Sequence, residues 1–188
     1  MLRTFIAARI PLHPQLEQLH ASLERIVPEL RPVRLSNLHV TLKFLGETGA
    51  SQVPAVVKIL SQTAAATPSG VLHLQGVGAF PSTRRPSIVW IGIRPADFLG
   101  PLVERLHQDL RGLGFLPETR PFHPHVTLLR IKQPVPPPLR QWLSDHEQTD
   151  FGTVPIQEVV LMQSHLNPEG ATYTLLASAP LAKGSAAE

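Results

Sequence analysis

The chain has 188 residues, of which 43% are hydrophobic and 16% charged, enough apolar material for one compact domain and unlike a disordered protein. Cysteine is absent, which excludes disulfides, thiolate metal sites and a cysteine nucleophile. The formal charge of +3 comes without a long run of lysine and arginine, unlike proteins that grip long nucleic-acid duplexes.

Strand and helix patterns alternate along the first half of the chain. Strands are predicted over residues 4–8, 38–45, 71–77 and 88–93, and helices over 14–26 and 53–65. A loop rich in proline and serine separates the last two strands and contains Arg84 and Arg85. This pair is a candidate for guiding an RNA backbone, and a solvated pair of loop charges is an equally good interpretation.

The second half repeats the alternation and ends in a segment without large apolar side chains. The expected elements are a helix over 99–113, a strand over 125–131, a helix over 139–145, and strands over 159–164 and 172–177. We therefore predict one domain over residues 1–180 and a flexible tail over 181–188. No apolar run is long enough to cross a membrane, and the first ten residues do not resemble a secretory signal, so a cytosolic protein is expected.

The tetrapeptide His-Val-Thr-Leu occurs twice, at 39–42 and at 125–128, so that the copies lie 125 − 39 = 86 residues apart. Side chains alternate between the two faces of a strand. Each copy therefore places its histidine and threonine on one polar face, and its valine and leucine on the other. Two such halves facing each other would form a cleft.

In-line displacement at phosphorus suits this arrangement, because one group must take a proton from the attacking oxygen while another protonates the leaving oxygen. Histidine can do either near neutral pH. We therefore predict His39 and His125 as an acid/base pair, with Thr41 and Thr127 donating hydrogen bonds to phosphate oxygens. A cyclic phosphate fits such a site well, since its leaving oxygen stays tethered by the sugar.

Other residues near the motifs have competing interpretations. His123 lies two residues before His125 and is predicted to be a histidine at the strand entry, with a metal ligand as the alternative. Strict alternation places Phe44 in the core, and places Arg130 on the face opposite His125. Two interpretations of Arg130 are therefore equally good: a substrate contact and a structural residue at the rim. The remaining histidines are expected to be surface or structural.

Two segments, Asn37-Leu-His-Val-Thr-Leu-Lys-Phe-Leu-Gly-Glu47 and Arg120-Pro-Phe-His-Pro-His-Val-Thr-Leu-Leu-Arg130, resemble the paired signatures of the 2H phosphoesterase superfamily. The Gly78-Ala-Phe-Pro81 turn and the Val89-Trp-Ile-Gly92 strand are similar to its bacterial and archaeal branch, the ThpR or LigT type of RNA 2',3'-cyclic phosphodiesterase, once called 2'-5' RNA ligase. The resemblance covers nearly the whole chain, up to about residue 164.

This resemblance implies an α+β fold of two pseudo-symmetric lobes, with two antiparallel sheets facing a central cleft and helices outside. It also implies hydrolysis of an RNA 2',3'-cyclic phosphate to a 2'-phosphomonoester without metal or cofactor. By motif order, His39 is the acid for the 3' oxygen and His125 the base for water, while Thr41, Thr127 and Arg130 bind the substrate. The expected partners are RNA ends carrying a cyclic phosphate, such as tRNA fragments, or small cyclic nucleotides, and a monomer is expected.

Two alternatives and a reverse reaction stay open. The first alternative is a binding module for RNA ends that has no chemistry. The second is a metal-dependent hydrolase built around His123 and His125. Joining RNA ends by a 2'-5' bond is the reverse of the same displacement and would use the same two histidines.

Overall fold

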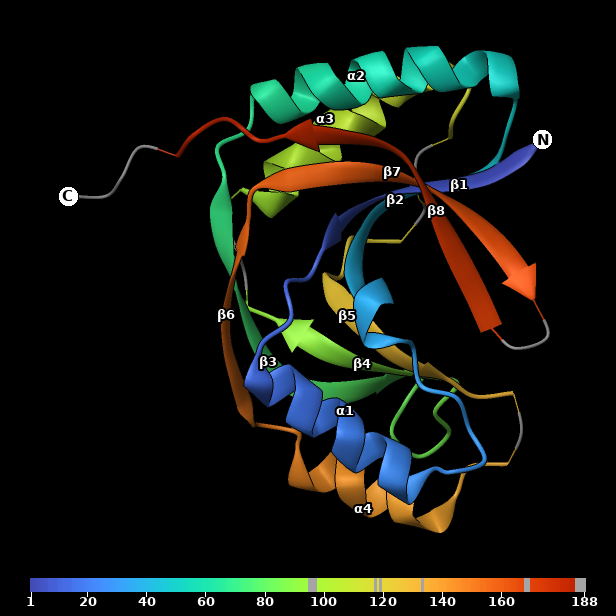
Figure 1. Cartoon of the computed structure of the whole chain (residues 1–188), viewed down its shortest axis with the longest axis vertical. Coiled ribbons are helices and arrows are strands. Elements are labelled where there is room, and N and C mark those ends of the chain that lie inside the picture. The colour runs from blue at the N-terminus through green and yellow to red at the C-terminus, as the bar shows by residue number, and fades with distance from the viewer. Residues whose placement is uncertain (95–97, 117, 119, 133, 168–169, 185–188) are drawn as a thin grey trace.

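The computed structural model describes residues 1–94, 98–116, 118, 120–132, 134–167 and 170–184, and its strands form one curled antiparallel sheet (Figure 1). The strand order is β6-β3-β4-β5-β2-β1-β7-β8. The strands are β1 (Leu2–Arg9), β2 (His39–Thr48), β3 (Gly70–Phe80), β4 (Ile88–Ile93), β5 (His125–Arg130), β6 (Asp150–Ile156), β7 (Glu158–Asn167) and β8 (Gly170–Pro180). The helices are α1 (Pro14–Ile26), α2 (Val53–Ala65), α3 (Leu99–Arg111) and α4 (Pro137–Asp145), with short 3-10 turns η1 (Leu35–Asn37) and η2 (Ala50–Gln52).

The predicted helices and strands are all present, with ends that differ by a few residues, and the α+β class is confirmed. One strand, β6, was missed by the sequence patterns. Its sequence contains Gly152 and Pro155, which normally argue against a strand, and it lies at the edge of the sheet where proline is tolerated. Phe151, Val154 and Ile156 of β6 are buried in the core.

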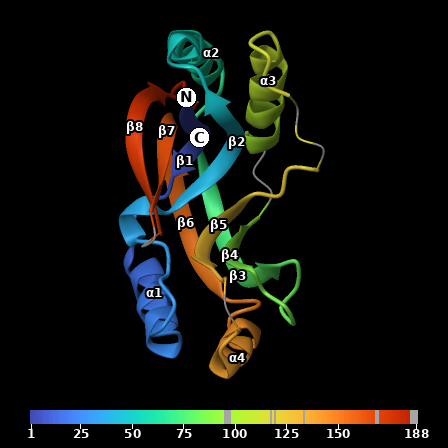
Figure 2. The ribbon, with the colours of Figure 1, turned by 90° about the vertical axis from the view of Figure 1, so that its right-hand side faces the viewer.

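The helices cover the two ends of the sheet in pairs. Helices α2 and α3 lie together at one end and α1 and α4 at the other, with the sheet running between them (Figure 2). Helix α3 shows why these segments pack. Its buried residues recur at helical spacing and form one apolar stripe, namely Leu99, Leu102, Val103, Leu106 and Leu110.

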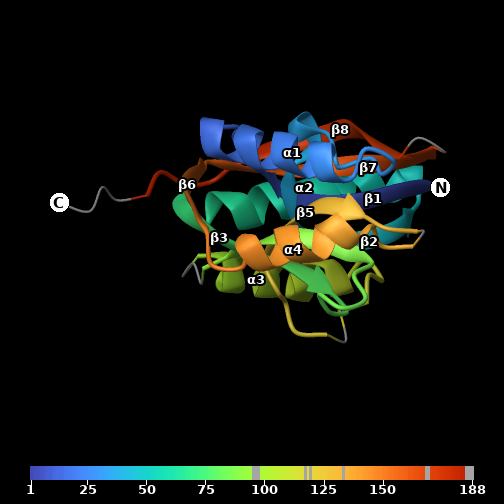
Figure 3. The same ribbon diagram turned by 90° about the horizontal axis from the view of Figure 1, so that it is seen from below.

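At the opposite end α1 and α4 lie side by side (Figure 3), and the indole Nε1 of Trp142 donates a hydrogen bond of 2.9 Å to the hydroxyl of Ser22. That bond satisfies the polar atom of a largely buried ring. The helices at both ends of the sheet are packed on one continuous core.

The two halves of the sheet, β6-β3-β4-β5 and β2-β1-β7-β8, meet at its centre. Strand β2 pairs antiparallel with β1 on one side, β5 pairs antiparallel with β4 on the other, and β2 pairs with β5 through Val40 and Val126. The expected pair of facing sheets is thus joined through β2 and β5 into a single curved sheet. Both motifs consequently lie on its two central strands.

The end of the described chain packs against the body of the protein. Leu181 is buried, and the backbone N–H of Gly184 donates to the hydroxyl of Ser69. Residues 185–188 of the predicted tail lie outside the described residues. No helix in the described part of the chain is both long and apolar enough to cross a membrane.

Candidate active site

The two histidines and two threonines of the repeated motifs lie on the same face of β2 and β5. Val40 is paired with Val126, and continuing this register places His39 opposite Thr127 and Thr41 opposite His125. Both valines are fully buried, whereas the four polar side chains are partly exposed. Each histidine therefore stands diagonally across from the other, about 7–8 Å apart by normal sheet geometry. We call this surface the polar face.

Each motif contains a β-bulge at the same place. In β5, Thr127 and Leu129 pair with consecutive residues of β4, so Leu128 is the extra residue; in β2, Leu42 is the extra residue in the same way. A bulge inserts one residue and reverses the alternation of faces after it. Leu128 and Leu129 are accordingly both buried, and Arg130 returns to the polar face. The expectation that Arg130 lies opposite His125 is therefore wrong.

Phe44 occupies the position in β2 that Arg130 occupies in β5, since 130 − 44 = 86. The bulge at Leu42 turns it out of the core, and its ring is 42% exposed. The predicted core position of Phe44 is wrong for the same physical reason. The guanidinium of Arg3 lies over this ring, with its carbon 4.8 Å from the ring centroid.

Backbone carbonyls fix both imidazoles. Nδ1 of His39 lies 2.6 Å from the carbonyl oxygen of Asn37, and Nδ1 of His125 lies 2.7 Å from that of His123. A carbonyl only accepts, so Nδ1 carries the proton in each ring and donates it. Nε2 is therefore the nitrogen available to a substrate, and it can accept a proton when the ring is neutral and give one when it is charged.

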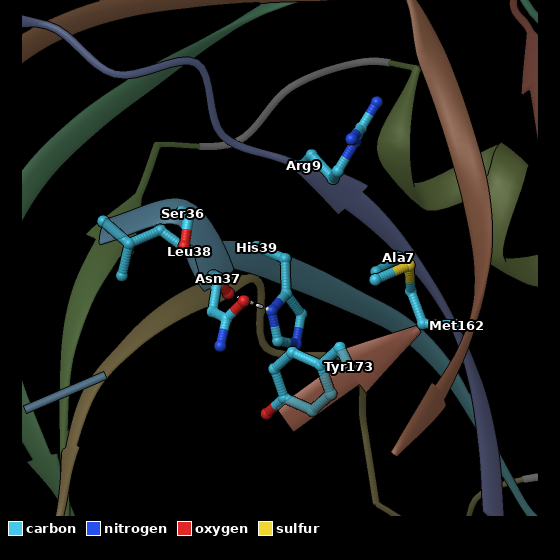
Figure 4. A pocket seen from close by; sticks show the side chains of 8 residues that line it. All are labelled: Ala7, Arg9, Ser36, Asn37, Leu38, His39, Met162 and Tyr173. Atoms are coloured by element: carbon cyan, nitrogen blue, oxygen red, sulfur yellow. Dashed lines mark hydrogen bonds between the residues drawn. The ribbon is translucent and has the colours of Figure 1, made fainter. Parts of the chain in front are cut away.

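Aromatic rings flank His39 on the side of β1 and β8. Its ring centroid lies 5.0 Å from that of Phe5 and 5.3 Å from that of Tyr173, whose plane is perpendicular to it. Figure 4 shows the imidazole of His39 between Asn37 and Tyr173. Tyr173 is the chain's only tyrosine, and burial raises the pKa of its phenol.

His125 has a different aromatic neighbourhood. Phe80 lies 5.2 Å from it and Trp90 lies 6.3 Å from it between centroids, and the ring of His123 packs on both Phe80 and Trp90. The indole of Trp90 lies on Gly78, where an added Cβ would come within 2.3 Å of the ring. The Gly-Ala-Phe-Pro and Val-Trp-Ile-Gly segments thus contribute Gly78, Phe80 and Trp90 to one wall of the candidate site.

Burial lowers the pKa of both catalytic candidates below the ordinary histidine value. For His39, loss of hydration is the main cause, the hydrogen bond to Asn37 opposes it, and the charges of Arg130 and His125 lower the pKa further. For His125, burial is again the main cause, opposed by the bond to the carbonyl of His123, with His123 and Arg130 adding smaller decreases. The charge of Arg130 thus acts on both rings, and its role as a substrate contact stays a prediction.

A small pocket opens beside His39, lined by Ala7, Arg9, Ser36, Asn37, Leu38, His39, Met162 and Tyr173 (Figure 4). A larger pocket of about 390 Å³ lies next to it and shares Arg9, Ser36 and Leu38 with it. We call the first the His39 pocket and the second the outer pocket.

Several contributors to the site escaped the sequence patterns. The carbonyls of Asn37 and His123 carry no side-chain signal, and Tyr173 comes from a distant strand. Lys43 is buried by the bulge, and its ammonium donates to the carbonyl of Leu116 on the segment that leads to the second motif. That bond ties the strand of the first motif to the approach to the second.

The other histidines and the loop arginines lie elsewhere. His20 bonds the carbonyl of Val33, His73 pairs with Asp150, and His165 bonds Thr174. Arg84 and Arg85 are exposed in the hairpin between β3 and β4, where Ser87 accepts a hydrogen bond from the backbone of Ile131 beside Arg130. Within the described ranges, no three or more His, Asp or Glu side chains are grouped as a metal site.

Comparison with known proteins decides the family. The model of the LigT-like phosphoesterases matches twice, over residues 10–90 and 91–173. This chain belongs to that family. It is 34% identical to the RNA 2',3'-cyclic phosphodiesterase of Escherichia coli over 74% of this chain and 80% of that protein. It is 33% identical to the protein of the same name from Aeropyrum pernix, over 86% of this chain and 92% of that protein.

Solved structures agree with the sequence matches. A Thermus thermophilus protein, TT0787, superimposes with a TM-score of 0.77 at 28% identity, covering 97% of this chain and 99% of that one. Escherichia coli LigT in its apo form gives 0.73 at 28% identity, covering 97% and 98%. A complex of LigT with 3'-AMP gives 0.70 at 26% identity, covering 96% and 98%. The chain is therefore a phosphoesterase, as its repeated motif predicts.

Proposed function

We propose that this phosphoesterase hydrolyses the 2',3'-cyclic phosphate at the end of an RNA to a 2'-phosphomonoester. The observation that carries the proposal is the diagonal arrangement of two histidine/threonine pairs on one face, each histidine with Nδ1 bound and Nε2 free. The phosphate would lie between the four side chains. Relatives named RNA 2',3'-cyclic phosphodiesterase support this choice of substrate.

In the proposed reaction, Nε2 of His125 takes a proton from water as its oxygen attacks phosphorus. The bond from phosphorus to the 3' oxygen breaks, and Nε2–H of His39 protonates that oxygen. The hydroxyls of Thr41 and Thr127 donate to the non-bridging oxygens, and Arg130 offsets their growing charge. The products are a 3'-hydroxyl and a 2'-phosphate, and proton exchange with solvent resets both rings.

The assignment of His39 as the acid is supported by what lies beside it. The leaving 3' oxygen stays on the ribose, so the acid must stand on the nucleoside side of the phosphate. His39 lines one of two adjacent pockets, which share Arg9, Ser36 and Leu38, whereas Phe80, Trp90 and His123 flank His125. The lowered pKa of His39 in the free protein opposes this role. A bound phosphate anion raises that pKa and so charges the ring when substrate arrives.

Phosphorus NMR of a 2',3'-cyclic nucleotide incubated with the protein and EDTA tests the proposal. We expect conversion to a 2'-phosphate alone. A 3'-phosphate product would overturn the leaving-group assignment. Loss of turnover in EDTA that one metal restores would favour the metal-dependent alternative, and tight binding without conversion in calorimetry would favour the binding module.

In ligation a ribose 5'-hydroxyl would take the place of water: Nε2 of His125 takes its proton as the 5' oxygen attacks phosphorus, the bond to the 3' oxygen breaks, and Nε2–H of His39 protonates that oxygen, which leaves a 2'-5' bond. Both directions use the same two imidazoles by microscopic reversibility. The monomeric state and the cytosolic location stay predictions, which gel filtration with light scattering and cell fractionation would check.

A further inference from the structure

The two sides of the phosphate position differ in what lies beyond them. On the His125 side, Phe80 and His123 pack edge-on at 5.5 Å and, with Trp90, form an aromatic wall. On the His39 side, the His39 pocket and the outer pocket lie next to each other and share Arg9, Ser36 and Leu38 in their linings. A substrate larger than one nucleotide therefore has open space on the His39 side.

The chemistry of the proposed substrate requires an exit on one side. Water approaches phosphorus opposite the leaving oxygen, and that oxygen remains part of the terminal ribose. The RNA chain leaves the same ribose through its 5' oxygen. The chain therefore extends from the side of the acid, which is where the outer pocket lies.

The outer pocket has the size and chemistry for a nucleoside. Its volume of about 390 Å³ falls within the usual range of about 300–1,000 Å³ for small-ligand sites. Pro11, Leu12 and Pro155 provide exposed apolar walls, and the amide of Gln157 and the hydroxyl of Ser36 supply hydrogen-bonding groups. Apolar walls with a few polar groups are the usual surroundings of a bound base.

Arg9 marks the boundary between the two pockets. It is the β1 partner of His39, but its side chain points away from the imidazole (Figure 4). Its guanidinium pairs with Glu158 and its side chain is 50% exposed. The carboxylate of Glu158 also accepts from the hydroxyl of Ser178, and both partners lower its pKa. The ion pair with Glu158 holds the guanidinium of a residue that lines both pockets, and the guanidinium has further N–H groups for a phosphate oxygen.

We propose that the outer pocket binds the nucleotide that precedes the terminal one, and that Arg9 contacts the phosphodiester between them. This inference rests on the proposed function and makes it more specific. It predicts a preference for oligoribonucleotides with a cyclic phosphate end over cyclic mononucleotides.

The experiment compares kcat/KM for adenosine 2',3'-cyclic phosphate with that for the dinucleotide ApA ending in a 2',3'-cyclic phosphate. In the unaltered protein we expect the dinucleotide to be preferred, with a preference that weakens at higher salt. Arg9→Gln should reduce the ratio of dinucleotide to mononucleotide kcat/KM about tenfold, as expected for loss of a charge-assisted hydrogen bond. Leu12→Glu, which adds a negative charge inside the outer pocket, should reduce the same ratio.

Arg105→Gln is the matched control, because Arg105 is also exposed and paired with a carboxylate, Asp109, but lies on α3. It should leave the ratio unchanged. A ratio within each variant is insensitive to partial misfolding, which lowers both rates together. An unchanged ratio in both Arg9→Gln and Leu12→Glu would refute this inference alone. Absence of turnover of either substrate by the unaltered protein would instead refute the proposed function.

Discussion

The half of the site around His39 and the half around His125 are built from the same local structure and differ in their surroundings. Both have the same tetrapeptide, the same bulge at its leucine and the same bond from Nδ1 to a carbonyl two residues earlier. Beyond the bulge one half presents Phe44 and the other Arg130. In the proposed mechanism, the features that the two halves share prepare both histidines for proton transfer, and their different neighbours are the basis for giving them different tasks.

The largest expected effect comes from removing either imidazole. His39→Ala and His125→Ala should each reduce kcat for a cyclic nucleotide by about 10² to 10⁴, because each removes one of two proton transfers in a single displacement. Steady-state rates with EDTA present would measure this. His165→Ala, at an exposed position on β7, should retain full activity. Unaltered turnover in both His39→Ala and His125→Ala would contradict the assignment of these histidines as an acid/base pair.

The threonines should have a smaller effect that is similar in the two halves. Thr41→Val and Thr127→Val keep the shape of the side chain and remove the donor to a phosphate oxygen, so we expect kcat to fall about 10²-fold in each. Thr153→Val on the exposed side of β6 is the matched control. A large loss in one variant with none in the other would show that the halves hold the phosphate unequally.

Arg130 should have the smallest effect on rate and a diagnostic effect on pH dependence. Its charge lowers the pKa of both histidines, so Arg130→Gln should raise both and move both limbs of the kcat/KM profile to higher pH, with a rate loss of about tenfold. The unaltered protein should have its kcat/KM optimum on the acid side of about pH 6.5, because both values are lowered. Arg140→Gln on α4 should leave the profile in place. A shift to lower pH in Arg130→Gln would contradict the assignment.

Sequence patterns predicted most of the fold and the shared face of the four central side chains, because periodicity and the repeat are local signals. Alternation failed at Phe44 and Arg130, where one extra residue reverses the faces. The consecutive apolar residues Leu128 and Leu129 are a sign of that bulge. In the first motif the two consecutive buried residues are Leu42 and Lys43, and because lysine is not apolar the sequence gives no such sign. Bulges depend on the partner strand, which a single segment does not specify.

The surroundings of the histidines depend on contacts between distant strands. Tyr173 reaches His39 from β8, and Trp90 reaches His125 because Gly78 leaves room for its ring. Neither contact follows from spacing along the chain. Two identical tetrapeptides therefore could not predict how the two halves differ, and the proposed direction of proton transfer rests on that difference.

A cyclic nucleotide with sulfur in place of the 3' bridging oxygen tests that direction most directly. A thiol, with a pKa near 8.5, leaves as its anion far more readily than an alcohol and does not require the acid. His39→Ala should therefore lose about 10² or more on the oxygen substrate, yet turn over the sulfur substrate within about tenfold of the unaltered protein. His125→Ala should be impaired on both. Rescue of His125→Ala in place of His39→Ala would reverse the roles of the two halves.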